Sequence, residues 1–274
     1  MCAYSVFNTF PVYPLSAKPL ILLAFCRYRY HTSLLFSPSD TTRAVERFPK
    51  ICVSTFSENI IRKFSSLPGV KKIAELYSAN GVVPVYKIRY RDTEIAFYLS
   101  RVGAPACVVG FEEVVAMGAE KFVLFGSCGT LNDERVRGKI IVPISAVRDE
   151  GTSYHYLAPS FEIEADPHSV QILESTLRDC GYPYVKGKVW TSDAIYRETI
   201  ELIEERKKEG CLAVEMECAA MLAVSRYRGI PFVQFLYGAD DLSSDSWEIR
   251  DLCLYGLTEA EKYMALAFEC GLAM

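Results

Sequence analysis

The sequence predicts a single-domain α/β fold with a mixed central sheet flanked by helices. From about residue 50 onward, short runs of β-branched and aromatic residues alternate with longer segments of helical character. This alternation is typical of strands that are connected by helices. Three of the helical segments are followed at once by Gly181, Gly210 and Gly229, and glycine is the usual residue just past the end of a helix.

The individual elements follow from local patterns. Residues 82–88 and 94–99 are two apolar runs around Arg91 and Asp92 and predict a hairpin. Pro105 is placed for the first turn of a helix that ends near Gly118. The predicted strands are 51–55, 82–88, 94–99, 121–125, 139–143, 185–191, 211–214 and 232–237, and the predicted helices are 58–64, 105–118, 169–180, 199–209, 216–228 and 258–269.

Composition limits the classes of function. The chain has 274 residues, half of them hydrophobic, and a net charge of -4, which is typical of a soluble globular protein. We expect no nucleic-acid partner, because the chain has no basic excess. The apolar run at 20–26 is too short to span a bilayer, so we expect no membrane partner.

The chain divides into two parts of unequal character. Residues 1–32 contain no Asp or Glu and carry three prolines, and we interpret them as an N-terminal extension, although this composition also fits a mitochondrial transit segment. Residues 33–274 show no repeat or linker and form the predicted domain. The ten cysteines lack C-x-x-C pairs and zinc spacing, which favours reduced thiols in a cytoplasmic protein with no metal and no organic cofactor.

Three polar stretches are predicted at the carboxyl edge of the sheet, where ligands bind in α/β folds. Residues 126–129, Gly-Ser-Cys-Gly, follow a buried strand and are expected to form a turn whose N–H groups hold an anion. Glu215 and Glu217 flank the start of a helix. Acidic side chains at this position are stabilised by the helix dipole, so the pair could also have a purely structural role. Asp240 and Asp241 follow a further strand.

Two of these acids suit the chemistry of a nucleoside. A carboxylate at Glu217 has two acceptor oxygens and therefore suits the two hydroxyls of a cis-diol such as ribose. Asp240 suits a general acid that protonates a departing nitrogen, while an Asp after a strand is also a common turn former. Sequence spacing does not choose between Asp240 and Asp241 for this role.

The chain from about residue 50 to 245 resembles the purine nucleoside phosphorylase and uridine phosphorylase family. The stretches that carry the resemblance are 126–129, 146–156, 191–196 and 214–220, the last of which reads Val-Glu-Met-Glu-Cys-Ala-Ala. The resemblance implies a three-layer fold with a partly barrel-like sheet. It also implies a homo-oligomer built from dimers, such as a hexamer, and a reaction in which inorganic phosphate is the co-substrate that cleaves a nucleoside.

The resemblance also implies roles for single residues. Asp240 lies 23 residues after Glu217, which is the spacing of the purine-acting members, where this Asp protonates the base at N7. The residues after Tyr196 lack the Gln and Arg with which uridine phosphorylases read uracil, so a purine is favoured over uridine. The implied site is Gly126, Ser127 and Arg101 for phosphate, Met216 and Glu217 for ribose, and Ile195, Tyr196 and Asp240 for the base.

Two departures weaken the expectation of phosphorolysis. Leu124 and Asn59 stand where the family usually carries arginines that bind phosphate. Loss of two guanidinium groups weakens the binding of a dianion, and Arg101, Arg148 and Arg43 are the replacement cations that the sequence offers. A uridine phosphorylase, a nucleosidase that uses water, and a non-catalytic nucleoside-binding protein therefore stay open as alternatives.

Overall fold

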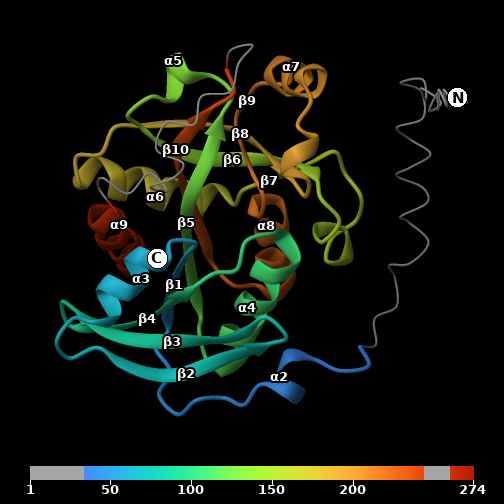
Figure 1. Cartoon of the computed structure of the whole chain (residues 1–274). Coiled ribbons are helices and arrows are strands. Elements are labelled where there is room, and N and C mark those ends of the chain that lie inside the picture. The colour runs from blue at the N-terminus through green and yellow to red at the C-terminus, as the bar shows by residue number, and fades with distance from the viewer. Residues whose placement is uncertain (1–33, 244–259) are drawn as a thin grey trace, which may run out of the picture.

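The computed structural model describes residues 34–243 and 260–274, so the expected extension at 1–32 lies outside the described residues. These residues contain a ten-stranded mixed sheet (Figure 1). Its strands are β1 (Ile51–Thr55), β2 (Lys71–Ser78), β3 (Gly81–Tyr90), β4 (Thr93–Leu99), β5 (Lys121–Thr130), β6 (Ile140–Asp149), β7 (Glu162–Glu164), β8 (Tyr184–Ser192), β9 (Cys211–Glu215) and β10 (Phe232–Asp241).

The helices start and end where local chemistry satisfies their termini. The side chains of Ser57, Asp166 and Thr199 accept from backbone N–H groups and cap α3, α6 and α7. Gly229 ends α8 in the left-handed conformation. The described helices are α2 (Pro38–Thr41), α3 (Glu58–Ser65), α4 (Ala104–Met117), α5 (Asp133–Val136), α6 (Pro167–Asp179), α7 (Ile200–Lys208), α8 (Cys218–Arg228) and α9 (Ala260–Ala273).

Part of the sheet closes on itself. The strands follow the order β10-β6-β8-β9-β5-β1-β4-β3-β2, and β10 pairs with β5 as well as with β6. Strands β5, β9, β8, β6 and β10 therefore form a closed five-stranded barrel, from which β1, β4, β3 and β2 extend as an open sheet. Parallel pairs such as β1–β5 and antiparallel pairs such as β5–β9 occur in the same sheet, which confirms the predicted mixed architecture.

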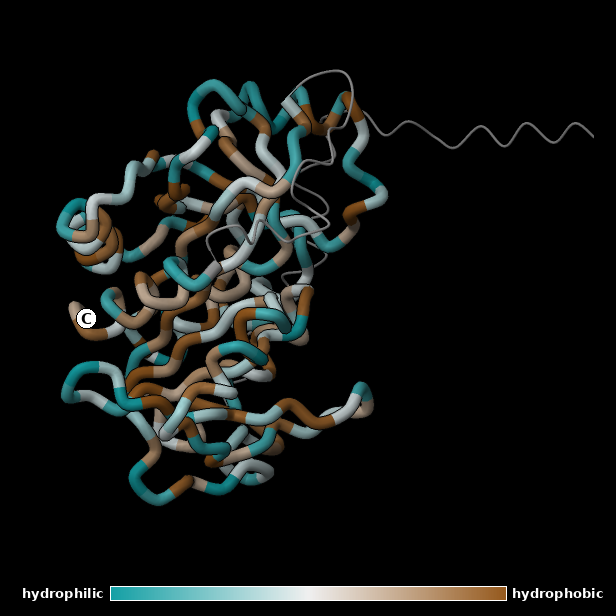
Figure 2. Tube along the Cα trace, turned by 60° about the vertical axis from the view of Figure 1, so that its left-hand side comes forward, coloured by the Kyte–Doolittle hydropathy of each residue, from teal (hydrophilic) through white to brown (hydrophobic). Residues whose placement is uncertain are grey.

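Two hydrophobic layers hold helices against the sheet. Phe122 and Leu124 of β5 belong to one layer, which packs under α4 and α8, while Val123 and Phe125 belong to the other, which packs under α3, α6 and α9. This alternation follows from the two-residue period of a strand. The two groups of helices lie on opposite sides of β5 in Figure 1, and Figure 2 shows the hydrophobic segments concentrated along the central strands. The predicted three-layer fold is confirmed.

The prediction of a turn at residues 126–129 is wrong. These residues continue β5 to Thr130, and neither Gly126 nor Gly129 has a positive φ. The glycines are needed for space, because a Cβ on Gly126 would lie 2.6 Å from Cδ2 of Phe56. Strand β10 likewise continues through Asp241, with a bulge between Gly238 and Asp240, so the two aspartates lie within the strand and not after it. Closure of the barrel provides the pairing partners that extend both strands.

Gly129→Ala is expected to destabilise the fold. A Cβ at this position would lie 2.5 Å from Cδ1 of Leu242 and 3.0 Å from Cγ1 of Val214. Overpacking of this kind costs about 1–3 kcal/mol, which corresponds to a fall in Tm of about 2–10 °C for a chain of this size. Differential scanning calorimetry measures this, with Gly151→Ala as the control, because a Cβ there meets one atom at 4.0 Å. Equal Tm values for the two variants would contradict the prediction.

Candidate active site

The three polar stretches meet at Gly129. In the register of the barrel, Gly129 of β5 is paired with Asp240 of β10 on one side and with Val214 of β9 on the other. Val214 is followed by Glu215, Met216 and Glu217, which lead into α8. Residues that are far apart in the sequence therefore converge at one end of the barrel.

Glu217 is the N-cap residue of α8 and comes within reach of a second loop. One of its carboxylate oxygens, Oε1, accepts a hydrogen bond of 2.6 Å from the backbone N–H of Gly103. Gly103 is the N-cap of α4 and has a φ of 96°, a conformation that favours glycine. The side chain of Glu217 is buried, with 5% of the residue exposed. A carboxyl group has two oxygens and can accept more hydrogen bonds than this one.

Glu215 has a different task from Glu217. Its Oε2 accepts from the N–H groups of Glu217 and Cys218, each at 2.7 Å, and its Oε1 accepts from the Thr191 hydroxyl at 2.5 Å. The Thr191 oxygen in turn accepts from the N–H of Ala219 at 2.9 Å. Glu215 is therefore the acid that satisfies the amino-terminal end of α8, and the two explanations offered for the pair apply to different members.

The two glutamates influence each other's protonation. Burial raises the pKa of Glu217 well above its ordinary value, and the nearby charge of Glu215 raises it further. Burial also raises the pKa of Glu215, but Thr191 and two backbone N–H groups stabilise its ionised form. We therefore take Glu215 as the member that ionises first and Glu217 as the member that holds a proton to higher pH.

Asp240 and Asp241 have different surroundings, which indicates different roles. Asp241 is buried, and its Oδ1 accepts from the Thr130 hydroxyl at 3.3 Å and from the N–H of Ser243 at 2.8 Å, which secures the end of β10. Asp240 is half-buried, and its Oδ1 lies 3.4 Å from the point where a Cβ on Gly129 would be. The Asp240 side chain thus faces the junction of the three strands.

Glu198 is an acid near the site that sequence reasoning did not select as a site residue. It is half-buried, and burial together with the charge of Asp240 raises its pKa to about 7. It lies beside the short 3-10 helix Ile195–Arg197. The sequence signal that could have identified it is its place two residues after Tyr196, where the notable feature was the missing uracil-reading pair.

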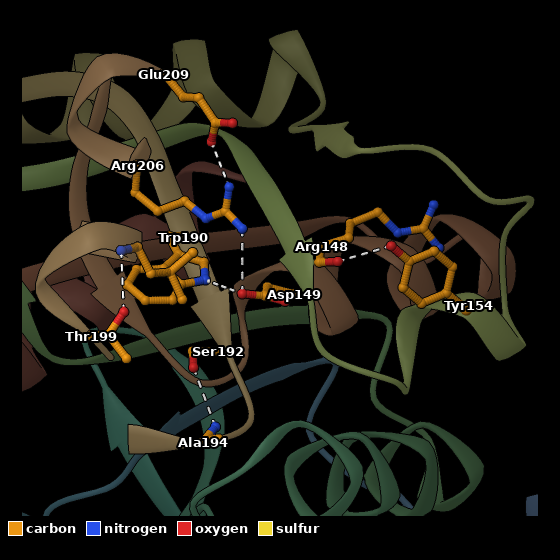
Figure 3. Close-up of polar contacts among 10 residues, drawn as sticks. Arg148, Asp149, Tyr154, Trp190, Ser192, Ala194, Thr199, Arg206 and Glu209 are labelled. Atoms are coloured by element: carbon orange, nitrogen blue, oxygen red, sulfur yellow. Dashed lines mark hydrogen bonds and ion pairs between the residues drawn. The ribbon is translucent and has the colours of Figure 1, made fainter. Parts of the chain in front are cut away.

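The predicted base-binding residues lie on an exposed loop. Ile195 is 53% exposed and Tyr196 is 96% exposed, so the described chain does not enclose them, whereas Met216 is half-buried. The strand that carries this loop is firmly held (Figure 3): Asp149 accepts from Nε1 of Trp190 at 3.0 Å and from Arg206 at 3.4 Å. Rigid β8 therefore ends in a surface loop at residues 193–199.

The cations expected at Gly126 and Ser127 are engaged elsewhere. The guanidinium of Arg101 donates to the carbonyl oxygen of Gly81 at 2.7 Å, in the β2–β3 hairpin. Arg148 donates to Ser153, to Ser160 and to the carbonyl of Ala158, and it holds its own loop together. Leu124 is fully buried, and Asn59 accepts from Arg62 of its own helix. Exposed Arg43 precedes β1. The guanidinium groups of Arg101 and Arg148 are thus already engaged by other parts of the protein.

Comparison with known proteins identifies the family. The chain matches the Phosphorylase superfamily over residues 50–253 and belongs to it. It is 26% identical over 183 residues to guanosine phosphorylase of Halorubrum lacusprofundi, covering 63% of this chain and 76% of that protein. It is 24% identical over 207 residues to a DeoD-type purine nucleoside phosphorylase of Vibrio cholerae, covering 75% and 80%.

A solved structure shows the same fold. Uridine phosphorylase from Vibrio fischeri superposes with a TM-score of 0.71 at 21% identity, over 86% of this chain and 97% of that one. Among the described residues no cluster of His, Cys, Asp and Glu has the arrangement of a metal site. No described helix is long and apolar enough to cross a membrane.

Proposed function

We propose that this chain is a nucleoside phosphorylase that cleaves the N-glycosidic bond of a purine nucleoside with inorganic phosphate. The observation that carries the proposal is the strand register, which pairs Gly129 with Asp240 on one side and on the other with Val214, three residues before Glu217. The names of the guanosine phosphorylase and purine nucleoside phosphorylase relatives support a purine substrate. Uridine is the alternative substrate, and the assay described below includes it.

In the proposed reaction an oxygen of phosphate forms a bond to C1′ of the sugar while the bond from C1′ to the base nitrogen breaks. The electron pair of the broken bond goes to the base, and Asp240 gives its proton to N7 of the purine. Glu217 accepts hydrogen bonds from the 2′ and 3′ hydroxyls and so fixes the sugar. The products are the free base and ribose 1-phosphate. Met216 packs against the sugar, and Ile195 and Tyr196 face the base.

Hydrolysis by water is the second candidate function. It is favoured by the residues near the expected phosphate position at Gly126 and Ser127. The guanidinium of Arg101 bonds to Gly81, and Leu124 replaces an arginine in the buried core. Water carries no charge and needs no cationic partner, whereas a phosphate dianion binds more weakly where guanidinium groups are missing. In this version the oxygen of water forms a bond to C1′ while the bond from C1′ to the base nitrogen breaks. The proton that water loses goes to solvent, Asp240 protonates the base as before, and the products are ribose and the free base.

One assay is expected to separate these functions. Purified protein is incubated with inosine, guanosine, adenosine or uridine, with and without phosphate, and base release is followed by liquid chromatography. Phosphorolysis predicts strict phosphate dependence and ribose 1-phosphate as product, while hydrolysis predicts release in phosphate-free buffer. Binding of a nucleoside without turnover of any of the four would contradict both enzymatic proposals.

We also propose a cytoplasmic homo-oligomer, built from dimers. The cysteines within 34–243 and 260–274 are all free thiols, which supports a reducing compartment. Exposed apolar side chains at Leu34, Phe36 and Val109 line a groove of about 470 Å³ beside α4, which supports an association surface. Light scattering after gel filtration tests the oligomer, and a monomer at micromolar concentration would contradict it.

A further inference from the structure

The aromatic ring of Phe56 covers the backbone at Gly126, where phosphate would bind in the proposed reaction. Phe56 lies in the loop between β1 and α3, and its ring packs on Gly126 of β5. Ring atoms Cδ2 and Cε2 lie 2.6 Å and 3.0 Å from the position that a Cβ on Gly126 would take. The ring is half-buried and packs against the hydrophobic layer under α4 and α8.

The residues on both sides of Phe56 are fixed, so its ring has a defined place. Thr55 is paired with Phe125 of β5, and its carbonyl accepts from the N–H of Ser100 at 2.9 Å. On the other side, the hydroxyl of Ser57 accepts from the N–H of Ile60 at 3.3 Å and caps α3. The loop is therefore anchored at the sheet and at the helix within one residue of the ring.

The position of the ring matters because of what an anion requires. A phosphate dianion loses much hydration energy on binding and needs N–H or guanidinium donors in return. The face of a phenyl ring carries partial negative charge and offers no donor. Leu124, on the same side of β5 and fully buried, adds a second apolar group where a cation would be favourable.

We propose that Phe56 is a specificity-determining residue for the acceptor. Its ring covers Gly126 and lowers the affinity of the site for inorganic phosphate, while the ribose and base ends are unaffected. This inference rests on the proposed function only in assuming that the acceptor enters at Gly126 and Ser127. Phosphate binds well only when the ring is removed or leaves Gly126.

The experiment compares the full chain with Phe56→Gly, Phe56→Ala and Phe56→Leu. Phe56→Leu is the matched control, because leucine keeps an apolar side chain of similar reach over Gly126. Binding of radiolabelled inorganic phosphate is measured by equilibrium dialysis at constant ionic strength without nucleoside, and the folded state of each variant is checked by its Tm. Where the glycine variant does not fold, the alanine variant provides the comparison.

We expect at least tenfold tighter phosphate binding in Phe56→Gly or Phe56→Ala than in the unaltered protein, and unchanged binding in Phe56→Leu. In turnover, the KM for phosphate falls by the same factor while the KM for nucleoside stays constant, which a merely structural role of the ring would not produce. Equal or weaker phosphate binding in the glycine and alanine variants would overturn the proposal. Because dialysis requires no turnover, absence of base release would overturn the proposed function alone.

Discussion

Glu217→Gln is expected to lower kcat/KM for nucleoside cleavage by about 10²–10⁴-fold and, at the same time, to stabilise the protein above neutral pH. The loss of activity follows from replacing an ionised carboxylate by an amide opposite two sugar hydroxyls. The rates are therefore compared above the raised pKa of Glu217, where each hydrogen bond to the charged group contributes about 1.5–3 kcal/mol. The amide retains one oxygen that accepts from the N–H of Gly103, so the loop contact at 2.6 Å is preserved.

The stabilisation follows from the raised pKa of Glu217. Between the ordinary pKa of a glutamate, 4.5, and the higher pKa in the folded state, the folded protein holds a proton that the unfolded chain has lost. The free energy of unfolding therefore falls as pH rises through this window, and the glutamine variant removes this fall. We expect equal Tm values near pH 4 and a higher Tm for Glu217→Gln at pH 8, by about 2–4 °C for each kcal/mol.

Glu215→Gln is the matched control, two residues away in the same buried pair. Its amide group would face Thr191 or the N–H groups of Glu217 and Cys218, all of which donate to the native carboxylate. A donor facing a donor costs about 1–3 kcal/mol, so we expect this variant to gain less stability at pH 8 than Glu217→Gln does. The measurements are calorimetric scans from pH 4 to pH 8. A Tm of Glu217→Gln below that of the unaltered protein at pH 8 would contradict the assignment.

Asp240→Asn is expected to slow purine nucleoside cleavage by about 10²–10⁴-fold, which is the usual contribution of a general acid. The asparagine keeps the shape of the side chain at the Gly129 junction but has no proton to give to N7. Uridine has no corresponding ring nitrogen, so its cleavage, where detectable, is expected to fall much less. Rates of base release from inosine and uridine measure the difference.

The neighbouring Asp241→Asn variant controls for damage to β10. Asp241 accepts from Thr130 and from the N–H of Ser243, so this variant is expected to lower the Tm and to affect both substrates equally. Equal loss of purine and uridine cleavage in Asp240→Asn would show that Asp240 is structural, as Asp241 is, and would remove the basis for preferring a purine.

Much of the fold could be predicted because its strands are buried and its helices are capped. The predicted helix at 58–64 corresponds to α3, and the predicted strands at 51–55 and 82–88 correspond to β1 and part of β3. Strand β2 escaped prediction because it lies at the edge of the sheet, where most of its side chains are at least partly exposed and give no buried pattern. The true lengths of β5 and β10 depend on a pairing between them that no local pattern encodes.

The sequence predicts candidate residues for the site but not the contacts that they make. The chemistry of a nucleoside and the family resemblance point to Glu217 and Asp240, and the register pairs Gly129 with Asp240 and with Val214, three residues before Glu217. Sequence could not show that Gly126 is a glycine because of Phe56, since that contact joins residues 70 positions apart in sequence. Nor could it show that the guanidinium of Arg101 bonds to Gly81, because that choice depends on where the β2–β3 hairpin lies.

Closure of the barrel has a consequence for how the site comes into being. Gly129 joins a strand that begins at Cys211 to one that begins at Phe232, and it lies in neither. Glu217, the proposed acceptor for the sugar hydroxyls, and Asp240, the proposed acid, therefore come together only once β10 has paired with β5 and closed the ring. This pairing joins segments far apart in the sequence, and we expect it to be a slow step in folding. A partly folded chain with an open ring holds both acids and no site. Competence to bind nucleoside should thus appear together with slow amide hydrogen exchange in β5, in one cooperative event.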